Sequence, residues 1–252
     1  THTHTHTHTH THTHAHTRAP AHTPTHTPTH THTHTPVSYT HLTLPTKRTA
    51  YTEDVGAAEK KQIEKEDLIP ADIYAKNRKQ IRKDLVEFKK NRRIALGPYA
   101  TFYFESFETI VAQVQEMLHI EKGGDEQLKD ELIAYNPLVP NGKELTATLM
   151  FEIDNPILRA AFLGKVGGIE EKIFIKINDE IVKAVPEEDV DRTSAEGKAS
   201  SVQFIHFKLN DDQISKFKSD SATIELGIDH KEYIHTTRLA EDSVKSLCAD
   251  FI

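Results

Sequence analysis

The sequence predicts an α+β fold, a single domain with a mixed, mostly antiparallel sheet and helices packed on it. Two long segments, residues 72–92 and 107–121, carry apolar residues at three- and four-residue steps, which is typical of amphipathic helices. From residue 145 the pattern changes to short apolar runs separated by Asn, Asp, Gly and Pro, which is typical of strands. Helical and strand patterns that mix along one chain favour a sheet covered by helices.

The first half of the domain is expected to contain a helix over 72–92, strands over 94–96 and 100–104, and helices over 107–121 and 125–135. A Gly97-Pro98 turn separates the two strands. Ser106 is placed to cap the helix that follows, and Gly123-Gly124 to end it. Residues 135–142 (YNPLVPNG) contain two prolines, two asparagines and a glycine, which indicates a rigid turn.

The second half is expected to contain strands over 145–153, 173–177, 181–185, 201–209 and 223–228, with helices over 156–166, 210–217 and 237–250. Pro156 suits the first turn of a helix, and Asn178-Asp179 suits a hairpin turn. The strand over 201–209 has apolar residues on both faces, so it is expected at the centre of the sheet. Residues 189–200 and 229–236 are polar and are expected to be loops.

The first 46 residues differ from the rest of the chain. Residues 1–35 are almost entirely Thr-His pairs and hold 13 of the 18 histidines, and residues 37–46 (VSYTHLTLPT) resemble a translated sequencing adapter. We interpret residues 1–46 as the translation of a CA dinucleotide repeat and an adapter, an assembly artefact that is expected to be disordered. The alternative is weak zinc or nickel binding by the alternating histidines. Residues 47–69 are interpreted as a charged linker and residues 70–252 as the single folded domain.

Composition limits the classes of function. After residue 48 the formal net charge is −10, and an acidic chain is a poor candidate for general nucleic-acid binding. The single cysteine, Cys248, permits no intrachain disulfide and is typical of a reducing cytoplasm. No apolar run approaches the roughly 18 residues of a membrane helix, and no phosphate-binding Gly-rich loop or Gly-x-Ser-x-Gly motif occurs. The sequence therefore predicts a cytoplasmic protein without nucleic-acid or membrane partners.

Five segments in series resemble one known family. They are residues 92–98 (RRIALGP), 113–121 (QVQEMLHIE), 135–142 (YNPLVPNG), 200–207 (SSVQFIHF) and 227–230 (GIDH). Together they resemble the uncharacterised bacterial family known as domain of unknown function 3501, from about residue 60 to the C-terminus. The resemblance implies no assigned activity, but it implies a redox or peroxide-defence context with rubrerythrin or an iron–sulfur protein related to heterodisulfide reductase as partner. Members often have His where this chain has Gln203, which puts a site role for that position in doubt.

Two histidines and three carboxylates are candidates for a chemical site. They are Glu116, Glu121, His206, Asp229 and His230. Asp229 and His230 directly follow the last expected strand, and Glu121 is expected on the apolar side of its helix. If these groups converge they would form a metal or acid–base site, although no known metal-binding spacing links them. The alternative is structural: a core histidine at 206, a turn-forming Asp229, and an arginine partner for Glu121.

Arg92, Arg93 and Asn136 are candidate contacts for an anionic ligand or a partner. The alternative for both arginines is to complement the C-terminal end of the basic helix and to pair with carboxylates. The alternative for Asn136 is rigid turn chemistry.

Two hypotheses of function follow. The first is a cytoplasmic accessory or binding protein that serves a rubrerythrin/iron–sulfur redox system and meets its partner through the basic helix or the loop over 229–235. The second is a metal-dependent or acid–base enzyme of unknown reaction that uses His206, Asp229 and His230. In the second hypothesis Glu116 or Glu121 completes the site. Neither hypothesis identifies a cofactor.

Overall fold

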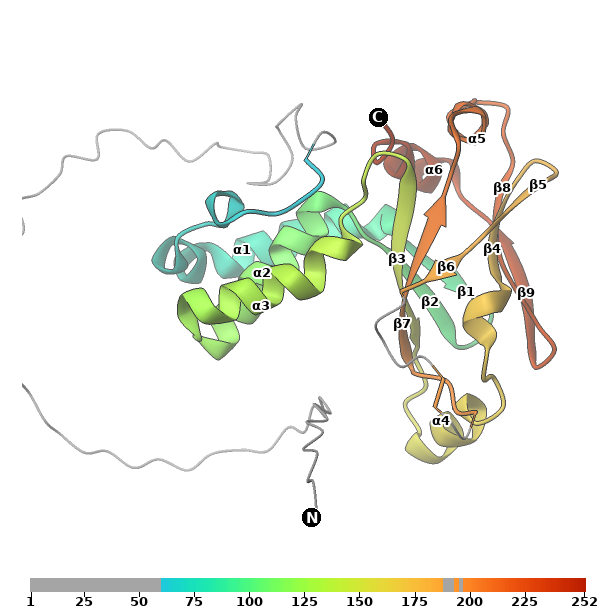
Figure 1. Cartoon of the computed structure of the whole chain (residues 1–252), viewed down its shortest axis with the longest axis horizontal. Coiled ribbons are helices and arrows are strands. Elements are labelled where there is room, and N and C mark those ends of the chain that lie inside the picture. Colours follow the sequence, from blue (N-terminus) through green and yellow to red (C-terminus); the bar gives the residue numbers. More distant parts are fainter. Residues whose placement is uncertain (1–59, 188–192, 195–196) are drawn as a thin grey trace, which may run out of the picture. The chain divides into compact units, whose positions relative to one another are not determined.

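The structure, a computed structural model, describes residues 60–187, 193–194 and 197–252. These residues belong to one compact unit and form six α-helices and nine strands (Figure 1). The Thr-His tract, the adapter-like segment and residues 47–59 of the expected linker lie outside the described residues.

The strands form two sheets. The first has the order β1 (Arg93–Leu96), β2 (Ala100–Phe104), β3 (Glu144–Phe151), β7 (Val202–Lys208) and β6 (Val185–Pro186). The second has the order β5 (Glu180–Lys183), β4 (Ile173–Ile177), β8 (Ile224–His230) and β9 (Tyr233–Arg238). Every strand pairing within the described residues is antiparallel. The α+β class is therefore confirmed, with two antiparallel sheets in place of the one mixed sheet that the sequence predicts.

One apolar core is shared by the two sheets. Because strand side chains alternate between faces, every second residue of each strand points to this core. Leu149 of β3, Ile175 of β4 and Leu226 of β8 belong to the same cluster and are fully buried. Each such side chain contributes roughly 1.5–3 kcal/mol relative to an exposed position. The opposite face of β3 carries threonines, and the Thr146 hydroxyl donates to the Leu138 carbonyl beneath the helices at 2.6 Å.

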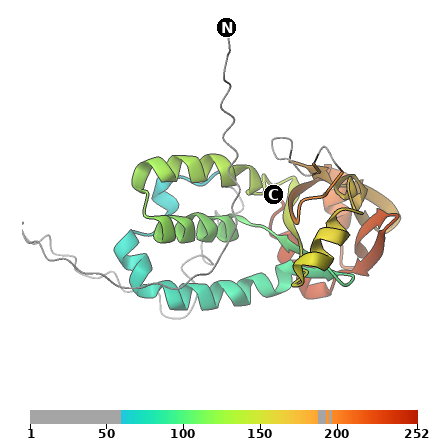
Figure 2. The same cartoon turned by 90° about the horizontal axis from the view of Figure 1, so that it is seen from below.

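A helical layer packs on the outer face of the first sheet. It consists of α1 (Ala71–Lys89), α2 (Phe107–Glu121) and α3 (Gly124–Tyr135), with α2 between the other two (Figure 2). Its own apolar cluster includes Val114 and Leu128, and Phe204 of β7 packs against that cluster. Ser106 caps α2 by accepting a hydrogen bond from the Thr109 amide, as the sequence predicts.

The remaining helical elements are short and lie between or beside the longer elements and strands. They are α4 (Pro156–Leu163), α5 (Asp211–Phe217) and α6 (Glu241–Cys248), with 3₁₀ turns η2 (Lys65–Asp67), η3 (Lys90–Arg92), η4 (Asn136–Leu138) and η5 (Ile169–Lys172). Pro156 occupies the first turn of α4, as the sequence predicts. In the described part of the chain, no helix combines the length and the apolar character needed to cross a membrane.

The expected loop over 229–236 is instead a strand hairpin. Asp229 and His230 end β8, where they pair with Ile234 and Tyr233 of β9. The prediction of a loop is wrong because β9 is an edge strand whose alternate side chains face water, so its sequence is polar. Asp229 and His230 are therefore held by backbone pairing inside the strand, directly before the two-residue turn of the hairpin.

Candidate functional site

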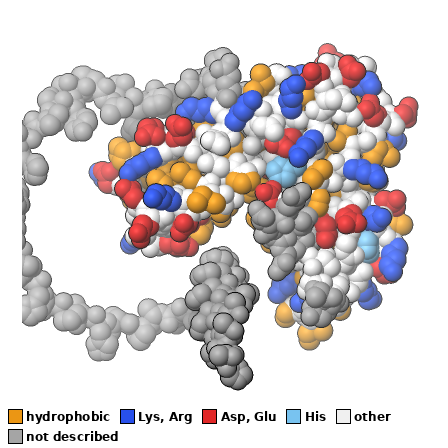
Figure 3. Space-filling model, viewed as in Figure 1, with side chains coloured by type: hydrophobic (Ala, Val, Ile, Leu, Met, Phe, Trp, Pro, Cys, Tyr) orange, Lys and Arg blue, Asp and Glu red, His pale blue; other side chains and the backbone are white. Residues whose placement is uncertain are grey.

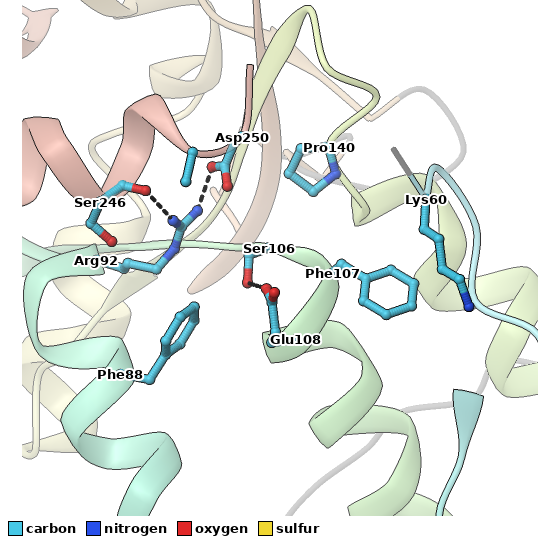
Figure 4. Close-up of a pocket in the computed structure, with 10 residues that line it drawn as sticks. Lys60, Phe88, Arg92, Ser106, Phe107, Glu108, Pro140, Ser246 and Asp250 are labelled. Atoms are coloured by element: carbon cyan, nitrogen blue, oxygen red, sulfur yellow. Dashed lines mark hydrogen bonds and ion pairs between the residues drawn. The ribbon is translucent and has the colours of Figure 1, made fainter. Parts of the chain in front are cut away.

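A pocket of about 290 Å³ lies where α1, the start of α2 and the C-terminal residues meet (Figure 4). It is lined by Lys60, Phe88, Arg92, Ser106, Phe107, Glu108, Pro140, Ser246, Ala249 and Asp250. We refer to it as the Arg92 pocket. Sites for small ligands have volumes of roughly 300–1,000 Å³, so this pocket suits a ligand of few atoms.

Arg92 is buried beside this pocket, with an exposed fraction of 2%. Its Nε donates to the Phe104 carbonyl at 3.0 Å, and Nη1 donates to the Ser246 carbonyl at 2.9 Å. Its Nη2 donates to the Glu105 carbonyl at 2.6 Å and to the Asp250 carboxylate. Four of its five N–H donors are thus used inside the protein. The guanidinium joins the C-terminal residues to the connection between β2 and α2, which is a structural role.

Two carboxylates of the pocket keep a free oxygen. Asp250 pairs with Arg92 through Oδ2, and Glu108 accepts a hydrogen bond from the Ser106 hydroxyl through Oε2 at 2.7 Å. Within the described residues, the second oxygen of each has no hydrogen-bond partner, and neither oxygen is fully buried. Burial, aided by the charge of Glu108, raises the pKa of Asp250 to about 6 against the attraction of the Arg92 guanidinium.

His206 lies between two carboxylates on the outer face of the first sheet. Its Nδ1 is 3.2 Å from Oε2 of Glu144, and its Nε2 is 2.6 Å from Oε2 of Glu187. Burial lowers the pKa of His206, but the hydrogen bonds to both carboxylates outweigh burial and leave this pKa above its ordinary value. The carboxylates occupy opposite sides of the ring, so all three groups cannot bind one ion. The described residues contain no group of three or more His, Cys, Asp or Glu side chains that could hold a metal.

His206 and His230 point to different layers of the protein. His206 follows Phe204 on the helix-facing side of β7, whereas His230 continues the inward-facing row of β8 that includes Ile228. Nδ1 of His230 accepts a hydrogen bond from the Glu232 amide in the β8–β9 hairpin. Asp229, on the opposite face of β8, is exposed. The structure therefore does not bring these three candidates together.

The two glutamates of α2 are also apart from His206. Glu116 binds the guanidinium of Arg78 and accepts a hydrogen bond from the Tyr74 hydroxyl at 2.7 Å. The hydrogen bonds from Arg78 lower the pKa of Glu116 to about 2, so it stays ionised. Glu121 is the last residue of α2 and is exposed to solvent. It accepts a hydrogen bond from Gln127. The expectation that Glu121 faces the apolar side is wrong.

Arg93 and Asn136 have partners within the fold. Arg93 pairs with Glu152 at 3.2 Å on the surface. The Asn136 side chain accepts from the Ile63 amide at 2.7 Å and donates to the Ile63 carbonyl at 3.2 Å. Ile63 is 2% exposed, so residues around it, within the range interpreted as a linker, pack on the helical layer.

Sequence reasoning missed the acidic members of both polar sites. Asp250 lies 158 residues from Arg92, and Glu144 lies 62 residues from His206. An arginine at the start of an apolar strand indicates that a carboxylate partner is needed, but local patterns do not identify which one.

One side of α1 carries a basic stripe. Ala75, Lys79, Arg82, Lys83 and Val86 follow a helical spacing and, with Arg78 and His119, line a shallow surface hollow. Within the described residues, Lys79, Arg82 and Lys83 form no ion pair, and Val86 is 71% exposed. On the face drawn in Figure 3, by contrast, basic and acidic side chains are interspersed.

The fold and the Arg92 pocket define an α+β protein that combines two antiparallel sheets, a three-helix layer and a small polar pocket. Comparison with known families identifies it further. The chain belongs to the family described as Protein of unknown function (DUF3501), whose model matches residues 62–251. A crystal structure of a novel protein of unknown function from Burkholderia pseudomallei K96243 is 36% identical, with a TM-score of 0.71. The match covers 76% of this chain and 100% of that one. No curated protein matches the chain.

Proposed function

We propose that this protein is an accessory protein that binds the acidic surface of a protein partner through the basic stripe of α1. The observation that carries this proposal is the set of unpaired cations on the stripe. The chain after residue 48 has a net charge of −10, yet Lys79, Arg82 and Lys83 lie together and form no ion pair among the described residues, although Arg82 also acts on the charge of Glu116. Charges arranged in this way steer a complementary partner and set its orientation.

The neighbouring residues favour a protein over a nucleic acid. Val86 adds an exposed apolar side chain to the stripe, and protein interfaces combine apolar contacts with a polar rim. The stripe is lined by no phenylalanine, tyrosine or tryptophan on which a base could stack. The family resemblance implies a redox context, so rubrerythrin from the same organism is the first partner to test and an iron–sulfur protein is the second.

The enzyme hypothesis has less support. His206, Asp229 and His230 lie on different faces of two sheets, and His206 is already bonded through both ring nitrogens. General acid–base catalysis needs a group within hydrogen-bond reach of a substrate.

Biolayer interferometry with the full chain and immobilised rubrerythrin tests the proposal. Binding is expected to weaken as salt rises, and the double variant Lys79→Glu/Lys83→Glu is expected to weaken binding by about tenfold or more. The matched control is Lys129→Glu/Lys172→Glu, which makes the same charge change at exposed lysines of α3 and η5. Equal binding by both double variants, or tighter binding to duplex DNA than to either protein, would contradict the proposal.

A further inference from the structure

We propose that the Arg92 pocket binds a primary ammonium group, carried either by a small free amine or by a lysine side chain of another protein. This site is separate from the basic stripe of α1, and neither proposal depends on the other.

The free acceptors of the pocket, among the described residues, are two carboxylate oxygens and the Ser246 hydroxyl, beside one remaining N–H of Arg92. Oδ1 of Asp250 and one oxygen of Glu108 have no partner among the described residues. Asp250 is 9% exposed and lines the pocket, and its pairing with Arg92 holds its carboxylate in place there. In Figure 4 Asp250 lies above Ser106 and Glu108, with the pocket between them. An ammonium group has three donors and no acceptor, which matches this arrangement.

Other classes of ligand fit less well. An anion would meet the carboxylates of Asp250 and Glu108, and the Arg92 guanidinium has already used four of its five donors on protein oxygens. The described residues provide no group of three or more side chains that could hold a metal ion. A charge-assisted bond from an ammonium to a carboxylate is stronger than a bond from a neutral hydroxyl.

Aromatic rings complete the pocket. Phe88 and Phe107 lie on opposite sides of it in Figure 4, so they offer apolar contact to the carbon chain of a bound amine. An ammonium group of the protein already lies on the Phe107 side of the pocket, because Nζ of Lys60 is 5.7 Å from the centre of the Phe107 ring. The Arg92 guanidinium is 6.0 Å from the centre of the Phe88 ring. Both rings are therefore already used to face cations.

Ligand-observed NMR titration of the full chain at neutral pH tests this inference. The probes are n-butylammonium chloride, n-butanol of the same length without charge, and sodium phosphate. Butylammonium is expected to bind and the other two are not. Glu108→Gln is expected to weaken butylammonium binding by about tenfold, because it removes a charge-assisted hydrogen bond. Glu108 is chosen because replacing Asp250 would leave Arg92 without its partner.

The matched control is Glu126→Gln, which makes the same change in the exposed first turn of α3 and is expected to bind like wild type. Thermal denaturation checks that each variant is folded. A second arm compares butylammonium with N-acetyl-lysine methylamide: tighter binding of the latter identifies a lysine of a protein as the source, and the reverse identifies a free amine. No butylammonium binding at millimolar concentration, equal binding of butanol or phosphate, or unchanged binding by Glu108→Gln overturns the inference.

Discussion

Replacing Arg92 by methionine is expected to destabilise the protein strongly. Methionine keeps much of the apolar length of the side chain and removes the guanidinium. Three backbone carbonyls, those of Phe104, Glu105 and Ser246, then lose a donor in a buried region. The Asp250 carboxylate loses its only cationic partner among the described residues.

The magnitude follows from burial. Removing one partner of a buried ion pair costs about 3–5 kcal/mol, because the other charge stays buried and unpaired. The side chains of Arg92 and Asp250 are 2% and 7% exposed, so water from the neighbouring pocket can reach only part of the hydrogen-bonding groups that are lost. The neighbouring Arg93 provides the matched control. Its side chain is 56% exposed and pairs with Glu152 on the surface, where an ion pair contributes about 0–1 kcal/mol.

Urea denaturation of the full chain at neutral pH, followed by circular dichroism, measures both changes. Arg92→Met is expected to lower the free energy of unfolding by about 3–5 kcal/mol, and Arg93→Met by less than about 1 kcal/mol. A loss below about 1 kcal/mol for Arg92→Met, or equal losses for the two variants, would refute the assignment of Arg92 as the connection between the C-terminal residues and the sheet.

Three other substitutions test the packing and the pH response. His206→Gln is expected to destabilise most at mildly acidic pH and less as the pH rises above about 6.5. Because the pKa of His206 is raised on folding, its contribution to the free energy of unfolding is full below the unfolded-state pKa and is lost as the pH rises through the folded-state pKa. A difference in urea denaturation that does not change with pH would contradict this. Gly227→Ala is expected to cost about 1–3 kcal/mol, because its Cβ would lie 2.3 Å from the Phe174 ring. Gly164→Ala, whose nearest contact is 3.4 Å, is the control, and equal melting temperatures would count against the clash. Tyr233→Phe is expected to cost about 2 kcal/mol, because the hydroxyl donates to one backbone carbonyl and accepts from two amides; an unchanged melting temperature would show that these bonds are dispensable.

Local patterns in the sequence were sufficient for the elements with strong periodicity. The apolar steps and the Ser106 cap place α2 at its observed bounds, Phe107–Glu121. The hairpin turn at Asn178-Asp179 is also found, with Asn178 at a positive φ of 54° between β4 and β5. Both depend on residues close together in the chain, which is why sequence patterns predict them.

Contacts between distant segments could not be predicted in this way. β9 could not be predicted from its own sequence, because only one of its outward residues, Ile234, Thr236 and Arg238, is apolar. It forms a strand because it pairs with β8. The partners of Arg92 and His206 lie far away in the chain, and one sequence gives no pairing information across such separations. Arg92 and His206 were selected for their residue types, and their carboxylate partners come from elements that only the tertiary fold brings near.

The attachment of Ile63 to Asn136 decides where a shortened version of this protein can begin. The Asn136 side-chain amide hydrogen-bonds both backbone polar groups of Ile63, as a neighbouring strand would, and the Ile63 side chain packs among α2, α3 and η4. A polypeptide that starts at α1 would expose these apolar side chains to water and leave the Asn136 amide without its partners. Expression boundaries drawn at the first long helix would therefore remove part of the cooperative folding unit, even though the described residues before α1 form only the short 3₁₀ turn η2.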